Sequence, residues 1–399
     1  MSDPTPFQIP IIDLRAQYTE IREAVRQAID DVNDSQQFIL GPAVNKFEAQ
    51  MAAYLRCQHA VGVASGSDAL LLALMALDIG PGDAVITTPF TFFSTVSSIT
   101  RLGALPLFVD IDPETYLIAA KSLEIFLQAR AQTAGGVTRD AKTGLRIKAL
   151  LPVHLFGQCC AMSGLTDMAR AYGLSIVEDV AQACGARMAV RGTTEFAGTM
   201  GDLGCFSFFP SKNLGGFGDG GMVCARNQEL ADKVSMLRRH GESTKYFHEV
   251  IGLNSRLDSL QAAVLGVKLL YLEAWCEARI QRAQRYHKLF SEGGLMGRGL
   301  TSIPPALTDK SHVFNNYVIG ADRRDELKQF LAERGIQTEI YYPLPLHLQN
   351  CFAFLGYKKQ DFPHAELAAS RVLALPLYPE LTVAQQERVA QAIGDFYRA

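Results

Sequence analysis

Short apolar runs alternate with helical segments along most of this chain. Seven of these runs have the length and the composition of buried β-strands. The expected strands are 60–64, 84–88, 105–109, 149–153, 174–178, 204–208 and 221–225. Strands that alternate with helices pair in parallel and are covered by helices on both faces. The pattern therefore predicts an α/β fold with a large domain built on a mainly parallel seven-stranded sheet.

Helical patterns flank this region on both sides. The expected helices before the sheet are 18–32 and 44–55, separated by Gly41-Pro42. The elements expected after it are helix 260–290, strand 314–319, helix 324–334, strand 337–340 and helices 365–373 and 383–396. The polar segment 132–144 is expected to be an exposed connection. We therefore expect an N-terminal arm and helix (1–40), a large domain (41–258) and a smaller C-terminal α+β domain (259–399).

Composition argues against several classes of protein. Of the 399 residues, 48% are hydrophobic and 20% are charged, and the net charge is −3. These are values of an ordinary globular chain without the basic excess of a nucleic-acid binder. No basic n-region with an apolar core opens the sequence, and the longest apolar run, 69–77, is too short for a membrane span. The eight cysteines form no Cys-x-x-Cys pair, so we expect no metal site, no disulfide framework and a cytoplasmic location.

Lys212 is the most informative residue for function. It lies between the apolar run 205–209 and a loop with five glycines in 215–221. Burial disfavours the ammonium form and leaves a neutral amine, which can form an imine with an aldehyde. Asp179 strengthens this interpretation over that of a solvated loop lysine, because it follows the apolar run 174–177 at the carboxyl end of an expected strand. An imine-forming lysine and an acid at a strand end together favour pyridoxal phosphate.

Three motifs resemble those of the DegT/DnrJ/EryC1/StrS family in order and spacing. They are Ser65-Gly66-Ser67-Asp68-Ala69-Leu70, Glu178-Asp179-Val180-Ala181-Gln182 and Ser207-Phe208-Phe209-Pro210-Ser211-Lys212. The resemblance covers nearly the whole chain and implies a fold-type I transferase that uses pyridoxal 5′-phosphate. It also implies an aminotransferase that moves an amino group from an amino acid, expected to be L-glutamate, to a keto group of a nucleotide-linked sugar. The product would serve amino sugar synthesis for a polysaccharide or a glycosylated metabolite.

The resemblance also assigns cofactor-binding roles. Lys212 would bind the cofactor covalently and act as the base, and Asp179 would keep the pyridine nitrogen protonated, which makes the ring an electron sink. The remaining cofactor contacts would come from Gly66, Ser67 and Ser207 at the phosphate, Phe92 at the ring face, Gln182 near the phenolic oxygen, and Asn254 of a neighbouring subunit. Helix capping would also account for Ser67 and Asp179, and core packing for Phe92.

Five further residues are expected on the substrate side by the same resemblance. They are His154, His240, Arg256, Tyr342 and His347. His154 follows an expected strand, although a lone histidine beside an apolar run is commonly a core residue. Asn254 and Arg256 resemble the segment through which a neighbouring subunit reaches the active site. The resemblance therefore implies a homodimer with shared active sites.

Three other functions stay open at this point. One branch of the family contains sugar dehydratases with a histidine in place of the lysine, and Lys212 favours transamination instead. A regulatory protein could keep the cofactor fold without catalysis. A lyase that acts on amino acids would need an arginine for the substrate carboxylate, and the sequence assigns none to that task.

Overall fold

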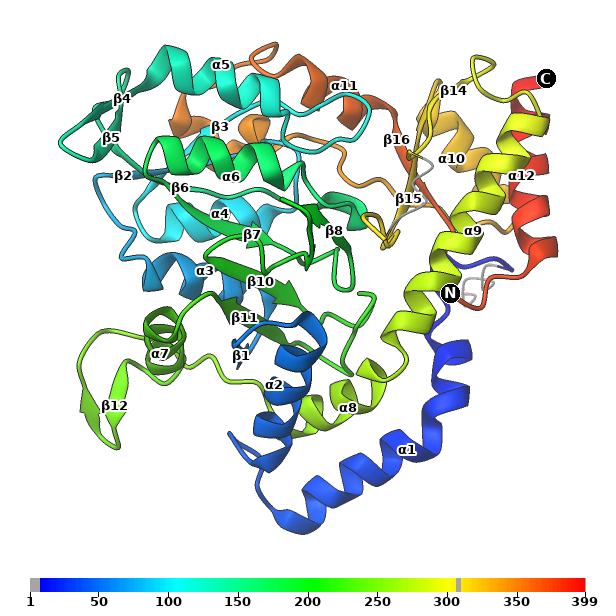
Figure 1. Ribbon diagram of the computed structural model, residues 1–399. Helices are drawn as coiled ribbons and strands as arrows, with labels where there is room; N and C mark the ends of the chain where they lie inside the picture. Colours follow the sequence, from blue (N-terminus) through cyan, green and yellow to red (C-terminus); the bar gives the residue numbers. More distant parts are fainter. Residues whose placement is uncertain (1–7, 306–309, 399) are drawn as a thin grey trace.

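The computed structural model describes residues 8–305 and 310–398. Its largest sheet confirms the expected alternation of strands and helices (Figure 1). From one edge to the other, the main strands are β1 (His59–Val63), β11 (Gly221–Ala225), β10 (Leu203–Ser207), β7 (Ser175–Asp179), β6 (Arg146–Leu150), β2 (Asp83–Thr87) and β3 (Leu105–Phe108). β11 runs antiparallel to both neighbours, and the other adjacent strands are parallel. The prediction of a large, mainly parallel sheet is therefore confirmed, but the sheet has nine strands rather than seven, because a hairpin of two further strands, β4 (Ala131–Ala134) and β5 (Val137–Asp140), pairs with β6.

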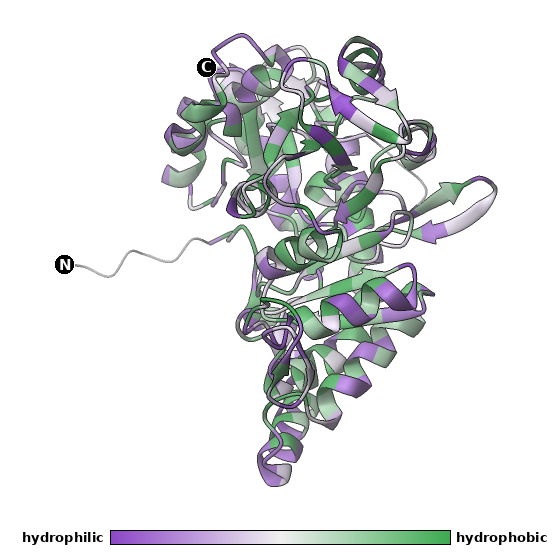
Figure 2. Ribbon diagram, turned by 90° about the vertical axis from the view of Figure 1, so that its left-hand side faces the viewer, coloured by the Kyte–Doolittle hydropathy of each residue, from purple (hydrophilic) through white to green (hydrophobic). Residues whose placement is uncertain are grey.

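Helices cover both faces of this sheet (Figure 1). One layer contains α3 (Gly66–Ala76), α4 (Phe93–Arg101) and α7 (Gln228–Leu237), and the other contains α5 (Ala120–Arg130) and α6 (Met162–Ala171). α3 is apolar on nearly all sides because it packs against β10 and β11 as well as against α4 and α7. In the view of Figure 2 the exposed helices carry hydrophilic residues on their outer sides. Both faces of the strands are thus buried, which explains their continuous apolar runs.

Two N-terminal helices pack against the start of the C-terminal part. α1 (Leu14–Ser35) extends along the lower edge of the molecule in Figure 1 and contacts α8 (Ser259–Leu269). α2 (Pro42–Leu55) contacts both α8 and β1. A small separate cluster of buried residues, which contains Ile21, Val25, Val264 and Trp275, holds α1 in place. The helix expected at 18–32 is confirmed as α1, which is longer at both ends.

The C-terminal part has its own small antiparallel sheet and its own hydrophobic core. The sheet consists of β14 (Leu300–Ser302), β15 (Tyr317–Ala321) and β16 (Val372–Leu375). The helices of this part are α9 (Leu272–Glu292), α10 (Arg324–Glu333), α11 (Pro363–Arg371) and α12 (Val383–Arg398). Tyr286, Phe290 and Tyr317 are completely buried in this core, which Ile9 also joins from the N-terminal arm.

The remaining elements are short. Two hairpins are formed by β8 (Arg187–Val190) with β9 (Thr193–Phe196) and by β12 (Glu242–Thr244) with β13 (Phe247–His248), and the 3-10 turns are η1 (Leu155–Gly157), η2 (Leu346–Leu348) and η3 (Asn350–Leu355). In the part of the chain that the structure describes, no helix combines the length and the apolar character needed to cross a membrane.

Three sequence expectations about elements were wrong, and one expected helix is confirmed with shifted bounds. The segment 132–144 is largely a hairpin of β4 (Ala131–Ala134) and β5 (Val137–Asp140), whose turn residues Gly135 and Gly136 both have positive φ. The helix expected at 260–290 is two helices, because α8 packs on α1 and α2 whereas α9 packs on α12. Residues 337–340 contain a single isolated bridge, from Glu339 to Ala374, instead of a strand. The helix expected at 365–373 ends at Arg371, and Val372 starts β16 in the core.

A pair of glycine substitutions tests how closely the sheet packs against its neighbours. A Cβ added at Gly204 in β10 would lie 2.2 Å from the carbonyl oxygen of Gly198, whereas a Cβ at Gly164 in α6 meets nothing within 4 Å. We expect Gly204→Ala to destabilise the protein by about 1–3 kcal/mol through overpacking. Gly164→Ala, the matched control, should raise stability by about 0.5–1 kcal/mol because alanine favours the helix. Urea unfolding of both variants measures this, and equal stabilities would contradict it.

Candidate active site

One cavity of about 460 Å³ lies at the carboxyl edge of the large sheet. Segments that follow β1, β2, β6, β7 and β10 contribute to its wall, as expected for ligand sites in α/β sheets. Its lining residues are Ile11, Ile12, Ser65, Gly66, Ser67, Leu70, Thr91, Phe92, Ser94, Val153, Leu155, Asp179, Ala181, Gln182, Ser207, Phe209, Ser211, Lys212, Asp219, Asn315, Asn316, Tyr341, Tyr342 and Leu377. We call it the active-site cavity. Residues of the C-terminal part and of the N-terminal arm thus form the rest of the cavity wall.

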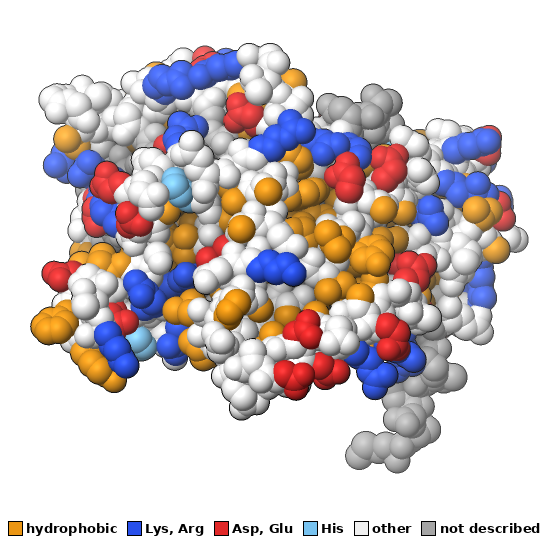
Figure 3. Space-filling model, turned by 60° about the horizontal axis from the view of Figure 1, so that its bottom comes forward, with side chains coloured by type: hydrophobic (Ala, Val, Ile, Leu, Met, Phe, Trp, Pro, Cys, Tyr) orange, Lys and Arg blue, Asp and Glu red, His pale blue; other side chains and the backbone are white. Residues whose placement is uncertain are grey.

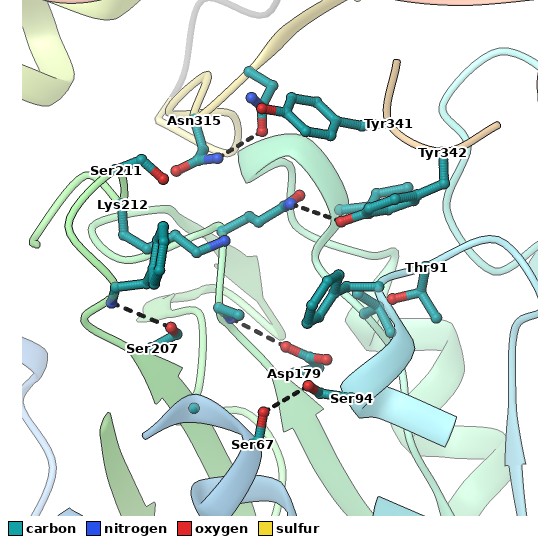
Figure 4. Close-up of a pocket in the computed structure, with 18 of the residues that line it drawn as sticks. Ser67, Thr91, Ser94, Asp179, Ser207, Ser211, Lys212, Asn315, Tyr341 and Tyr342 are labelled. Carbon is teal, nitrogen blue, oxygen red and sulfur yellow. Dashed lines mark hydrogen bonds between the residues drawn. The ribbon is translucent and has the colours of Figure 1, made fainter. Parts of the chain in front are cut away.

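Lys212 extends its amine into the centre of this cavity (Figure 4). It follows β10 in a short turn, in which its backbone N–H donates to the carbonyl of Phe209 at 2.9 Å. Burial lowers the pKa of the Lys212 amine from 10.5 to about 8, and the negative charge of Asp179 partly opposes this shift. A considerable fraction of the amine is therefore neutral and nucleophilic at mildly alkaline pH.

Asp179 ends β7 and is 4% exposed. Burial raises the pKa of its carboxyl, while hydrogen bonds from Ala181 and Thr95 and the charges of Lys212 and His154 act in the opposite direction. The backbone N–H of Ala181 donates to Oδ1 at 3.1 Å, and the hydroxyl of Thr95 donates to Oδ2 at 2.8 Å. The carboxylate is thus held in one orientation beside the cavity.

The opposite end of the cavity suits a phosphate group. Ser65 caps α3 by accepting from the N–H of Asp68 at 3.1 Å, and the N–H groups of Gly66 and Ser67 have no partner among the described residues. A helix N-terminus with free N–H groups favours an anion. The hydroxyl of Ser67 lies 2.6 Å from that of Ser94, and Ser207 lines the same end. A Cβ at Gly66 would come within 2.5 Å of the Cβ of Ser207, so this position needs glycine.

Aromatic and amide side chains line the space between these ends. Phe92 is 55% exposed, and its ring centroid lies 6.1 Å from that of Tyr342. Gln182 accepts from the N–H of Phe156 at 2.6 Å and donates to the hydroxyl of Tyr342 at 3.3 Å. Burial raises the pKa of Tyr342, so its hydroxyl stays neutral. Phe92, Gln182 and Tyr342 therefore line the cavity as the expectation requires, although their contacts with ligands remain predictions.

Two histidines expected at the substrate lie outside the cavity wall. His154 is completely buried, with Nε2 2.8 Å from Glu178 Oε2 and with Nδ1 accepting from the N–H of Cys160 at 3.0 Å. Burial lowers the pKa of His154, but its contacts with Cys160 and Glu178 outweigh this effect and raise it. His347 is 2% exposed and lies 3.2 Å from Glu366. Neither histidine lines the active-site cavity within a single chain, because its polar atoms are engaged in the protein interior, and the expected substrate roles of both remain predictions.

Three expected residues lie on the surface away from the cavity. Asn254 and His240 are exposed, and Arg256 is half-buried. Arg256 donates from Nε to Oδ1 of Asn254 at 3.0 Å. Within a single chain none of the three lines the active-site cavity. Their expected roles require a second subunit and remain predictions.

The structure adds residues that the sequence analysis did not assign. Ser94 joins Ser67 at the phosphate end, and Thr91 and Thr95 lie behind Asp179. Asn315 and Asn316 enter from the C-terminal part and are joined by a hydrogen bond of 2.6 Å (Figure 4). No helix was expected at this place, so no sequence pattern indicated that Thr91 and Thr95 meet. The asparagines carry no such signal in the sequence either.

The cavity fits one kind of cofactor. It has an anion site at the start of α3, a buried carboxylate at the end of β7 and a desolvated amine in the centre. Pyridoxal phosphate has a group for each of these: a phosphate, a ring nitrogen that is protonated beside an acid, and an aldehyde that reacts with an amine. Because the donor set matches at all three places, the fold and this cavity define a pyridoxal phosphate-dependent transferase of fold type I.

Comparisons with known proteins identify the family. The DegT/DnrJ/EryC1/StrS aminotransferase family matches residues 19–394. The chain belongs to this family and is a pyridoxal phosphate-dependent aminotransferase. One relative, 45% identical over 98% of this chain and 99% of its own, is the "Pleiotropic regulatory protein" of Geobacillus stearothermophilus. Another, 41% identical over 96% of this chain and 97% of its own, is the UDP-N-acetyl-3-dehydro-alpha-D-glucosamine 3-aminotransferase of Acidithiobacillus ferrooxidans.

Solved structures agree with this assignment. DesV of S. venezuelae, crystallised in complex with a ketimine intermediate, aligns with a TM-score of 0.89 and 40% sequence identity. The alignment covers 99% of this chain and 100% of that one. The similarity therefore extends through the sheet, the C-terminal part and the N-terminal arm, and the expected family and fold type are confirmed.

The lowered pKa of Lys212 predicts how fast the apo-protein binds its cofactor at different pH values. The neutral amine is the reacting form, so the rate should rise about tenfold per pH unit below the pKa and level off above about 8. Stopped-flow absorbance of the apo-protein mixed with pyridoxal phosphate measures this rate. A rate that still climbs towards 10.5, the ordinary value for lysine, would contradict the desolvation of Lys212.

Proposed function

We propose that this aminotransferase moves an amino group from L-glutamate to a keto group of a nucleotide-linked sugar. The single observation that carries the proposal is the pairing, across one cavity, of the desolvated amine of Lys212 with the buried carboxylate of Asp179. The family supports the sugar as acceptor, and the Acidithiobacillus relative is named as acting at sugar carbon 3. We propose the same carbon here, in a pathway of amino sugar or polysaccharide synthesis.

Each residue has a defined task in this reaction. When bound, pyridoxal phosphate supplies an electron sink for the carbanion left after loss of the α-proton. Lys212 holds the cofactor, and its released amine takes the α-proton of the amino donor as general base. Asp179 holds a proton on the ring nitrogen, and Gly66, Ser67 and Ser207 hold the phosphate. In the second half of the reaction Lys212 returns a proton to the sugar carbon that receives the amine.

The lining of the cavity supports a sugar as the second substrate. Hydroxyl and amide groups of Ser211, Asn315, Asn316 and Tyr342 line the cavity of about 460 Å³. Such groups bind the hydroxyls of a sugar. Lys212 is the only basic residue among the described residues that line the cavity.

The lack of a second cation in the described cavity wall supports a shared site in a homodimer. Glutamate and a sugar nucleotide both carry negative charges, so further cations must come from outside the single chain. Exposed apolar side chains are present for such an interface, among them Phe209 (51%), Phe217 (48%) and Phe247 (68%). Figure 3 shows apolar side chains gathered in the middle of the face that carries α1 and α8. We propose that a second subunit covers this face and that its Asn254 and Arg256 reach the cavity.

A regulatory function is the second candidate, because the Geobacillus relative has a regulatory name. The reactive features of the cavity argue for turnover, since a binding protein has no need of a lysine with a lowered pKa. The eight cysteines form no disulfide bond with one another in the described chain, which is typical of a reducing compartment, and we propose the cytoplasm.

Turnover in two half-reactions tests the function. L-Glutamate should convert the absorption band of the lysine-bound cofactor and release 2-oxoglutarate, and a 3-keto sugar nucleotide should restore the band. Lys212→Ala should lose at least about a thousandfold in turnover, because it lacks both the attachment point and the base. Its thermal unfolding should match that of the unaltered protein. A spectrum indifferent to glutamate would overturn the aminotransferase proposal, and turnover of amino acids alone would favour a lyase.

Mixed dimers test whether the active sites are shared. Lys212→Ala and Arg256→Ala should each be strongly impaired alone. After subunit exchange, half of the dimers are mixed and each mixed dimer has one intact site, so about a quarter of full activity should return. The control mixture of Lys212→Ala with Asp179→Ala should recover nothing, because both residues act in the same chain's site. No recovery in the first mixture would show that Arg256 does not act across the interface.

A further inference from the structure

Thr91, just before α4, and Thr95, in the first turn of α4, form a hydrogen-bonded chain that ends on Asp179. The hydroxyl oxygens of Thr91 and Thr95 lie 3.0 Å apart, and the hydroxyl of Thr95 donates to Oδ2 of Asp179 at 2.8 Å. All three side chains are buried, with exposed fractions of 2%, 0% and 4%. Of the two threonines, Thr91 lines the active-site cavity and Thr95 does not.

The number of hydroxyl protons decides which group donates in each of these hydrogen bonds. A threonine hydroxyl has one proton to donate, and that of Thr95 goes to the carboxylate. Thr91 must therefore donate to Thr95. Hydrogen bonds in series polarise one another, so the Thr91 hydroxyl strengthens the bond that Thr95 makes to Asp179.

The position of Thr95 also favours a charged partner. It lies in the first turn of α4, where the helix dipole is positive. A hydrogen bond to an ionised group is stronger than one between neutral groups. Asp179 is buried, and burial alone would favour its neutral form. The hydroxyl of Thr95 therefore acts against the desolvation of the carboxylate.

We propose that Thr95 is the positioning residue for Asp179, and that its hydroxyl keeps the carboxylate ionised and oriented towards the ring nitrogen of the cofactor. Oδ2 is occupied by Thr95 and Oδ1 by the N–H of Ala181, so the carboxylate cannot rotate without breaking one of these bonds. Thr95 itself does not line the cavity. Its effect on the reaction passes entirely through Asp179.

Three substitutions separate the hydroxyl from the rest of the side chain. Thr95→Val keeps the shape and removes the hydroxyl, whereas Thr95→Ser keeps the hydroxyl and removes the methyl. Thr100→Val is the matched control on the same helix, because among the described residues that hydroxyl bonds only to the carbonyls of Val96 and Ser97. The measurements are the dissociation constant of pyridoxal phosphate, the pH dependence of the glutamate half-reaction and the thermal unfolding of the apo-protein.

We expect Thr95→Val to weaken cofactor binding and to slow the glutamate half-reaction by about ten- to a hundredfold, the range for losing a hydrogen bond to a charged group. The acidic limb of the pH–rate profile of this variant in the glutamate half-reaction should move to higher pH, since the carboxyl of Asp179 loses a hydrogen bond that favours its ionised form. The other titratable groups that face Asp179 are Lys212, His154, Cys205 and Tyr342, and all are unchanged in this variant. Thr95→Ser and Thr100→Val should behave like the unaltered protein.

Thr91→Val provides a second route if Thr95→Val folds poorly. It leaves the bond from Thr95 to Asp179 and removes only the proton that Thr95 receives, so it should move the acidic limb in the same direction by a smaller amount. The proposal is overturned if neither valine variant moves this limb. It is also overturned if Thr95→Ser is as impaired as Thr95→Val, because packing of the methyl group would then explain the loss.

Discussion

Two neighbouring acids at the end of β7 point to opposite faces of the sheet, and the active site depends on both. Glu178 accepts from the N–H groups of Gly198, Met200 and Gly201 and lies against His154, whereas Asp179 reaches the cavity edge. A strand alternates its side chains with a period of two, so one strand end can supply a buried anchor and a functional acid together. Through these hydrogen bonds Glu178 holds the turn at residues 198–201 beside β10, the strand that leads to Lys212.

Desolvation links the packing of the whole molecule to the chemistry of Lys212. The amine has a lowered pKa because segments from three regions of the chain close around it: the large sheet, the C-terminal part and residues 11–12 of the arm. None of these regions alone forms the cavity. A weaker packing of the C-terminal part would therefore admit water and raise the pKa of Lys212 towards its ordinary value.

Sequence reasoning succeeded for residues that are tied to strand ends. Lys212, Asp179, Ser207 and the Ser65–Ser67 turn follow apolar runs that were recognisable as strands, and parallel strands end at one edge of a sheet. It did not indicate side-chain direction where neighbouring side chains of one segment face different ways. His154 also follows a strand, yet it turns inward to Glu178, while Val153 and Leu155 on either side line the cavity. Its direction depends on the turn at η1, where Phe156 has a positive φ that no sequence pattern indicated.

The sequence by itself determined the alternating strands and helices, the position of the reactive lysine and its acid, and the family resemblance, because all of these rest on local composition and spacing. Only the tertiary structure decided which side chains share the cavity. Thr95, Ser94 and Asn315 enter it or support it from segments distant from Lys212 along the chain, and His347 is directed away to Glu366. The physical reason is that such contacts arise from packing between elements, which the order of residues within one element does not specify.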